Sequence, residues 1–235
     1  MLINQKVSIC LNMIVKNESA IIRRLIDSVL PIIDSYCICD TGSTDKTPEI
    51  IESYFALSGI PGKVVREPFQ DFGYNRSNAL GHCIGMDNAD YLLLIDADMV
   101  LQIPKNFDVI RFKEYVASAD AHYMLQGTET FFYKNIRLVR NKPGINYWGV
   151  THEYMNLPVG TKYGFFNKCD IFIWDIGDGG AKTDKFERDI RLLKQGLKDI
   201  PNNDRYTFYL ANSLRDAGKM DEAIEMYNKR IALGG

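Results

Sequence analysis

Residues 92–98, LLLIDAD, end a strongly apolar run with two carboxylates, Asp96 and Asp98, which a single alanine separates. In an extended backbone, residues i and i+2 project to the same side, so both carboxylates would face one cleft. Their repulsion costs stability unless a cation lies beside them, and such oxygen ligands suit Mg²⁺ or Mn²⁺ together with phosphate oxygens. The segment therefore predicts a metal site that holds a diphosphate, with capping of the next turn as the alternative.

A second acidic loop, DTGSTDKT at residues 40–47, follows another apolar stretch. Asp40 ends the expected strand, Gly42 permits a tight turn, and the following helix would present free backbone N–H groups. A carboxylate in this place can accept hydrogen bonds from a nucleotide base or a ribose. Asn17 and Glu18 follow the first apolar stretch in the same manner. An ordinary strand-to-helix turn uses the same residue types and is the alternative.

A sheet is needed to bring these polar segments together. Apolar runs predict strands at residues 6–15, 35–40, 63–66 and 91–95. Helical periodicity predicts a helix after each of the first three strands, the last over about residues 74–86. This alternation indicates a parallel α/β sheet with crossover helices. Ligands of such sheets bind at the carboxyl ends of the strands, where all the polar segments fall.

The second half of the chain differs from the first in composition and in the elements that it predicts. Aromatic and β-branched residues indicate strands at residues 121–140, 147–157 and 170–174, which would extend the sheet in a mixed or antiparallel manner. From Thr183 the period is helical, and Asp184 with Glu187 has the spacing of a capping box.

The last two predicted helices, at residues 206–217 and 220–233, strongly resemble a tetratricopeptide repeat. Ala211 and Ala223 would let these helices approach, and Gly218 suits the left-handed turn between them. One repeat cannot bury both of its faces, so we expect a longer protein of which this chain is a fragment.

Composition excludes several classes of protein. The chain has 235 residues, 46% of them hydrophobic, and a formal net charge of −2, which predicts no nucleic-acid partner. No run approaches the ~20 apolar residues of a membrane span, and no signal-peptide run begins the chain. The five cysteines lack the spacing of a disulfide framework, so we expect a cytoplasmic protein. Neither a dinucleotide fingerprint nor a phosphate-binding P-loop motif is present.

The motifs MIVKNE, DTGSTDKT and LLLIDADM, in this order and spacing, resemble those of family 2 of the nucleotide-sugar glycosyltransferases. The resemblance covers roughly residues 6–180 and implies the GT-A fold, a mixed sheet flanked by helices. It implies two parts, a transferase domain at residues 1–180 and a tetratricopeptide-like helical segment at residues 181–235. Some members of the family carry such repeats after the catalytic domain.

The resemblance also assigns roles to the polar residues. Asn17, Glu18 and Asp40 would line the nucleoside pocket. Asp96 would contact the ribose or the metal, and Asp98 would be the principal ligand of Mn²⁺ or Mg²⁺. Arg76 matches a basic residue of the family and would steady carboxylates or the diphosphate, unless it is a solvated helix arginine.

The second half of the chain supplies the candidate catalytic residues. Glu153, in YWGVTHEYM, is the candidate base that deprotonates an acceptor hydroxyl, with His152 as a metal or phosphate partner. An ordinary strand with an exposed His-Glu pair is the alternative. Asp175 and Asp178 lie in a glycine-rich segment that would close over the donor or serve as a hinge. Ile176 stands where related sequences often have histidine, which puts metal dependence in question.

The residues and the family resemblance together imply a metal-dependent, inverting transferase that uses a UDP-sugar. Its acceptor would be a glycan, lipid or polypeptide, and its helical repeat would bind a protein partner. A degenerate transferase domain that serves as a binding scaffold is one alternative, favoured by Ile176. A nucleotidyltransferase is another, although its usual phosphate loop is missing here. A haloacid-dehalogenase-like phosphatase is set aside, because its D-x-D motif follows the first strand.

Overall fold

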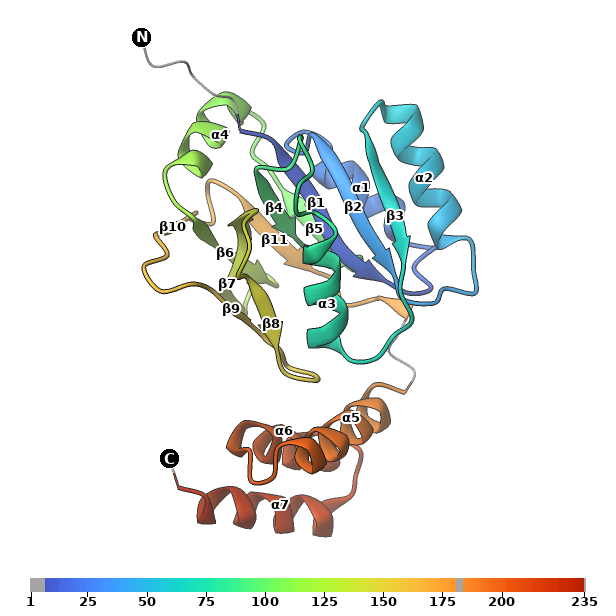
Figure 1. Ribbon diagram of the computed structural model, residues 1–235, viewed down its shortest axis with the longest axis vertical. Coiled ribbons are helices and arrows are strands. Elements are labelled where there is room, and N and C mark those ends of the chain that lie inside the picture. The colour runs from blue at the N-terminus through green and yellow to red at the C-terminus, as the bar shows by residue number, and fades with distance from the viewer. Residues whose placement is uncertain (1–6, 181–183, 235) are drawn as a thin grey trace.

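A computed structural model describes residues 7–180 and 184–234 of the protein (Figure 1). The first half alternates strands and helices in the order β1 (Ile9–Val15), α1 (Ile22–Val29), β2 (Ser35–Asp40), α2 (Thr47–Ser58), β3 (Gly62–Arg66), α3 (Phe72–Gly81) and β4 (Tyr91–Leu94). Strands β3, β2, β1 and β4 lie side by side and run parallel. The predicted parallel α/β sheet is therefore confirmed.

Both faces of β1, β2 and β4 are buried, which explains why these strands are continuously apolar. Side chains alternate along β4: Tyr91 and Leu93 join the core under α1 and α2, whereas Leu92 and Leu94 join the core under α3. Helix α1 buries one stripe at helical spacing against the first core. The sheet edge at which β1, β2 and β4 end is thereby held rigidly.

The second half extends the sheet with further elements, namely β5 (Met99–Gln102), α4 (Val109–Ala117), β6 (Ala121–Gly127), β7 (Phe132–Arg140), β10 (Tyr163–Phe165) and β11 (Phe172–Asp175). Strand β7 is antiparallel to β4 and β6, whereas β11 is parallel to β6 and antiparallel to β5. The predicted mixed extension is confirmed. Because β6 runs in the direction of β4, its carboxyl end also lies at the edge that bears the polar segments.

The prediction of one strand over residues 147–157 was wrong. The structure has a separate hairpin of β8 (Asn146–Trp148) and β9 (Tyr154–Asn156), joined by a turn at residues 149–153. Gly149 and His152 adopt left-handed backbone conformations there, with φ of 111° and 49°. Glycine at the first position explains why the strand stops.

Other boundaries shift slightly. Helix α3 ends at Gly81 rather than near Met86. The first strand begins at Ile9, while Lys6 and Thr183 lie outside the described residues. Asp184 precedes the next helix, but its side chain accepts no capping hydrogen bond from the described part of the chain, contrary to the capping box.

Three helices follow: α5 (Lys185–Asp199), α6 (Asp204–Asp216) and α7 (Met220–Ala232). Figure 1 shows them beyond the end of the sheet that carries α3 and the β8–β9 hairpin. Ala211 and Ala223 are buried, Tyr227 donates a 2.6 Å hydrogen bond to Asn212, and Gly218 has φ of 77°. The pair α6–α7 thus packs as expected, and its assignment as a tetratricopeptide repeat stays a prediction. None of the helices in the described part of the chain is long and apolar enough to cross a membrane.

Candidate active site

The loops after β1 and β2 are tied to each other at the carboxyl edge of the sheet. Val15 and Asp40 are paired in the strand register. The backbone N–H of Asn17 donates to Ser43, and the Asn17 side chain accepts a 2.8 Å bond from the N–H of Thr44. Asn17, with φ of 57°, therefore joins the two loops, and it is not among the residues that line the cavity at Asp40.

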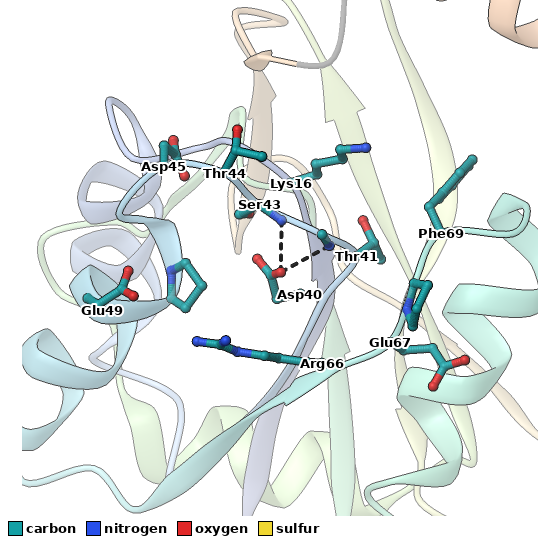
Figure 2. A pocket seen from close by; sticks show the side chains of 13 residues that line it. Lys16, Asp40, Thr41, Ser43, Thr44, Asp45, Glu49, Arg66, Glu67 and Phe69 are labelled. Atoms are coloured by element: carbon teal, nitrogen blue, oxygen red, sulfur yellow. Dashed lines mark hydrogen bonds between the residues drawn. The ribbon is translucent and has the colours of Figure 1, made fainter.

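Asp40 lies in a cavity of about 540 Å³ (Figure 2). Its Oδ1 accepts hydrogen bonds from the N–H groups of Gly42 and Ser43. Its buried Oδ2 has no hydrogen-bond partner among the described residues. A buried acceptor without a partner is costly, so this oxygen is suited to a ligand N–H or hydroxyl.

The cavity walls include three residues that sequence reasoning missed, namely Lys16, Arg66 and Phe69. Arg66 is paired with Asp40 in the register of β2 and β3. It could have been found, because it ends a parallel strand at the same edge as Asp40. Lys16 and Arg66 bring positive charge, and Phe69 brings an aromatic ring, to a cavity otherwise rich in oxygen atoms. Such a set of side chains suits a nucleoside with phosphate groups.

Glu18 lies away from this cavity. Its Oε2 accepts a 3.1 Å hydrogen bond from the N–H of Gly180. A Cβ placed on Gly179 would lie 3.2 Å from both Glu18 Oε1 and Asp98 Oδ2. The two carboxylates therefore converge on the same glycine.

The backbone at Asp96 and Asp98 is a turn between β4 and β5, not an extended strand, because the N–H of Met99 donates to the carbonyl of Asp96. The expectation that both carboxylates project to one side of a strand was therefore wrong. Asp96 faces two arginines, with Arg76 at 2.7 Å and Arg137 at 3.6 Å. Burial raises the pKa of Asp96, but the two guanidinium groups outweigh burial and lower it.

Arg76 bridges two carboxylates. Its guanidinium group donates one hydrogen bond to Asp96 and a second, from Nε, to Glu153, each of 2.7 Å. Burial lowers the pKa of Arg76, but the charges of Asp96 and Glu153 outweigh burial and raise it. Only 17% of the Arg76 side chain is exposed. Arg76 is thus an organiser of carboxylates and not a solvated helix arginine.

Arg137 continues this network into the sheet and was missed from the sequence. It donates hydrogen bonds to Gln126 (2.6 Å) and to the carbonyl of Leu94 (3.0 Å). Gln126 in turn donates to the hydroxyl of Tyr133. No local motif marks Arg137, since only the pairing of β7 with β4 brings it to Asp96.

His152 packs away from these carboxylates. Its ring stacks on Tyr209 of α6, with ring centres 4.1 Å apart and planes 6° apart. Burial lowers the pKa of His152. The predicted metal ligands Asp96, Asp98 and His152 are therefore not brought together. Within residues 7–180 and 184–234, no three His, Cys, Asp or Glu side chains are grouped as metal ligands.

The convergence at Gly179 nevertheless fits a hard cation. Mg²⁺ and Mn²⁺ accept one or two carboxylates and complete their coordination with water and substrate phosphates. Asp98 and Glu18 present that donor set. A nucleotide diphosphate would supply the remaining oxygens.

The glycine-rich segment after β11, residues 176–180, packs against Asp98 and Glu18. The N–H groups of Ile176 and Gly177 lie 3.2 and 3.4 Å from the carbonyl of Asp98 and donate to it. Asp178 forms two hydrogen bonds with Arg24 of α1, at 2.9 and 2.6 Å. These bonds raise the pKa of Arg24. Asp175, at the end of β11, is paired with Met99 in the sheet.

The architecture is that of an α/β domain with a polar site at the carboxyl edge of a mixed sheet, and comparison with solved structures finds the same fold. The fold is similar to that of S. aureus TarS, with a TM-score of 0.53 and 12% identity over 88% of this chain and 43% of that one. It is also similar to the mannosyltransferase PcManGT of Pyrobaculum calidifontis, solved with GDP-Man and Mn²⁺, with a TM-score of 0.51 and 12% identity over 96% and 79%. The predicted GT-A fold is confirmed.

Sequence comparison gives the family. Residues 10–172 match the model of "Glycosyl transferase family 2", and the chain belongs to this family. It is 24% identical over 233 residues to the SPbeta prophage-derived glycosyltransferase SunS of Bacillus subtilis, across 95% of this chain and 53% of SunS. It is 30% identical over 156 residues to the TPR repeat-containing protein Synpcc7942_0270 of Synechococcus elongatus, across 64% and 36%. The chain thus spans about half the length of SunS. The predicted membership of glycosyltransferase family 2 is confirmed.

Proposed function

We propose that this chain binds a UDP-sugar together with Mn²⁺ or Mg²⁺ and transfers the sugar, with inversion, to an acceptor hydroxyl. One observation carries the proposal: the Asp40 cavity opens at the same sheet edge as the Asp96–Arg76–Glu153 cluster. Family membership and the Mn²⁺-bound mannosyltransferase of similar fold support it.

In this proposal Asp40 holds the nucleoside through its unpaired oxygen. Lys16 and Arg66 attract the diphosphate from the walls of the cavity. Asp98 is the principal metal ligand, with Glu18 beside it, and Asp96 is fixed by arginines toward the ribose. A bound divalent cation would stabilise negative charge on the leaving diphosphate.

Glu153 is the proposed base. The acceptor oxygen forms a bond to the anomeric carbon while the bond from that carbon to the diphosphate oxygen breaks. The acceptor proton passes to the Glu153 carboxylate, and the nucleoside diphosphate leaves with the electron pair. Arg76 fixes the carboxylate of Glu153 through its Nε. Asp175 and Asp178 hold the covering segment in place and are proposed to act by position.

The proposal is tested by release of nucleoside diphosphate from UDP-glucose, UDP-N-acetylglucosamine and GDP-mannose, with water or added alcohols as acceptor. We expect release from a UDP-sugar by the unaltered chain and a loss of at least about a hundredfold in Glu153→Gln, the range of a general base. Donor binding should survive this substitution. Equal turnover in Glu153→Gln would place the base elsewhere, and the absence of any nucleotide binding would favour the scaffold alternative.

A further inference from the structure

The turn that carries Glu153 is held from one side by α3. The N–H groups of Phe72 and Gly73, at the start of that helix, donate to the carbonyls of Val150 (3.0 Å) and Gly149 (3.1 Å). A Cβ on Gly73 would lie 2.5 Å from the Gly149 carbonyl oxygen, so helix and turn are in direct backbone contact. The helix that supplies Arg76 thus also anchors the turn that presents its partner.

Helix α6 holds the same turn from the other side. Arg205 donates a 2.6 Å hydrogen bond to the carbonyl of His152, the residue before Glu153. The hydroxyl of Tyr206 accepts a 3.3 Å bond from the N–H of Val150. The Tyr206 ring also stacks on Trp148, with centres 5.0 Å apart and planes 12° apart.

Helix α5 completes the enclosure. Thr151 donates to the buried carboxylate of Asp189 at 3.4 Å. A Cβ on Gly196 would lie 2.8 Å from the ring of Tyr206 and 3.3 Å from Val150, so glycine is required for this close packing. The turn at residues 149–153 is therefore enclosed by α3, α5 and α6.

We infer that the helical segment is part of the active site and that Arg205 and Tyr206 are positioning residues for Glu153. The inference rests on the proposed role of Glu153 as base. The family match ends at residue 172, before α5 begins, and assigns no role to these helices. Arg205 and the stack of His152 on Tyr209 fix the backbone on the N-terminal side of Glu153, while Arg76 fixes its carboxylate.

The test compares Arg205→Met, Tyr206→Phe and Arg205→Lys with a matched control, Arg215→Met, in the full chain. Arg215 is also an arginine of α6, but it is exposed and pairs with its neighbour Asp216. Each variant is assayed for nucleoside diphosphate release from UDP-glucose, UDP-N-acetylglucosamine and GDP-mannose, and for binding of the same sugars by calorimetry. Hydrogen exchange of the amides at residues 149–153 is measured in parallel.

We expect kcat to fall by between about tenfold and about a hundredfold in Arg205→Met, because a small displacement of a catalytic group has that cost. The Kd of the donor should stay within about twofold, because the Asp40 cavity is untouched. Arg205→Lys should recover part of the loss, and Arg215→Met should match the unaltered chain. Tyr206→Phe keeps the stack on Trp148 and should speed exchange of the Val150 amide.

The two proposals fail in different ways. An unaltered chain that neither binds nor cleaves any of the three sugars contradicts the proposed function. Unchanged kcat in Arg205→Met and Tyr206→Phe, with an active unaltered chain, overturns the positioning role. Unchanged exchange at residues 149–153 in both variants overturns that role even if the chain is inactive.

Discussion

Arg76 and Glu153 lie 77 positions apart in the chain, yet Nε of one is 2.7 Å from Oε1 of the other. The same guanidinium group reaches Asp96 at 2.7 Å. One arginine thus joins the turn after β4 to the turn between β8 and β9. This relationship connects the proposed donor side of the site with the proposed base.

Loss of Arg76 should damage both stability and activity. In Arg76→Met, Glu153 loses its ion pair and Asp96 keeps only Arg137. We expect the free energy of unfolding to fall by about 2–3 kcal/mol, less than for a fully buried pair because Arg137 remains. Urea unfolding measures this, with exposed Arg23→Met of α1 as a control that should change by less than about 0.5 kcal/mol. An equal fall in the free energy of unfolding in Arg76→Met and Arg23→Met would contradict a stabilising role for the Arg76 ion pairs.

The Arg24–Asp178 ion pair should control the mobility of residues 176–180 more than global stability. Its side chains are 35% and 42% exposed, so solvent screening limits the pair to about 1 kcal/mol or less. In Arg24→Gln we expect faster hydrogen exchange at Gly177 and Gly180, with Arg23→Gln unchanged. Equal exchange in the two variants would show that the backbone hydrogen bonds to Asp98 and Glu18 hold residues 176–180 in place without the ion pair.

Substitution of Gly180 should displace the same segment. A Cβ there would lie 2.3 Å from the carbonyl oxygen of Asn17, a backbone atom that cannot move cheaply. We expect Gly180→Ala to weaken donor binding, measured by calorimetry. Gly81→Ala in α3, where a Cβ would meet no described atom within 4 Å, should leave donor binding unchanged. An unchanged donor Kd in Gly180→Ala would show that this segment does not contribute to donor binding.

Stability should fall as pH is lowered through the range of histidine. Burial lowers the pKa of both His122 and His152 in the folded chain, so the unfolded chain binds more protons. The contribution of these two histidines to stability is present in full above the ordinary histidine pKa of about 6.5. It is lost as the pH falls through their lowered pKa values in the folded chain. His152→Phe keeps a ring for stacking on Tyr209 and should reduce the slope of unfolding free energy between about pH 7 and 5. An unchanged slope would mean that His152 does not contribute.

The fold was largely predictable because both faces of the central parallel strands β1, β2 and β4 are buried. The run YLLL of β4 and the run SYCICD of β2 are buried at every position, so composition alone marked them as central strands. The turn at residues 149–153 was not predictable from apolar content. It depends on one glycine and on contacts with α3 and α6, which lie far away in the sequence.

The site was predictable only in part. Asp40 and Arg76 were found because strand ends and family motifs mark them. Arg137 was missed, since its role arises from the pairing of β7 beside β4. His152 was expected at the metal, but a left-handed backbone turns it to α6. Asp96 was expected to need a cation, and arginines from α3 and β7 supply the positive charge instead.

The most direct test of the account is calorimetric titration of the chain with UDP- and GDP-sugars, with and without Mn²⁺. We predict that a UDP-sugar binds only when Mn²⁺ is present and that Asp98→Asn abolishes this metal-dependent binding. Asp87→Asn, at an exposed residue before β4 and so at the opposite edge of the sheet, should retain it. Metal-independent binding of equal strength in the unaltered chain and in Asp98→Asn would contradict the assignment of Asp98, and the lack of any binding by folded protein would contradict the donor site itself.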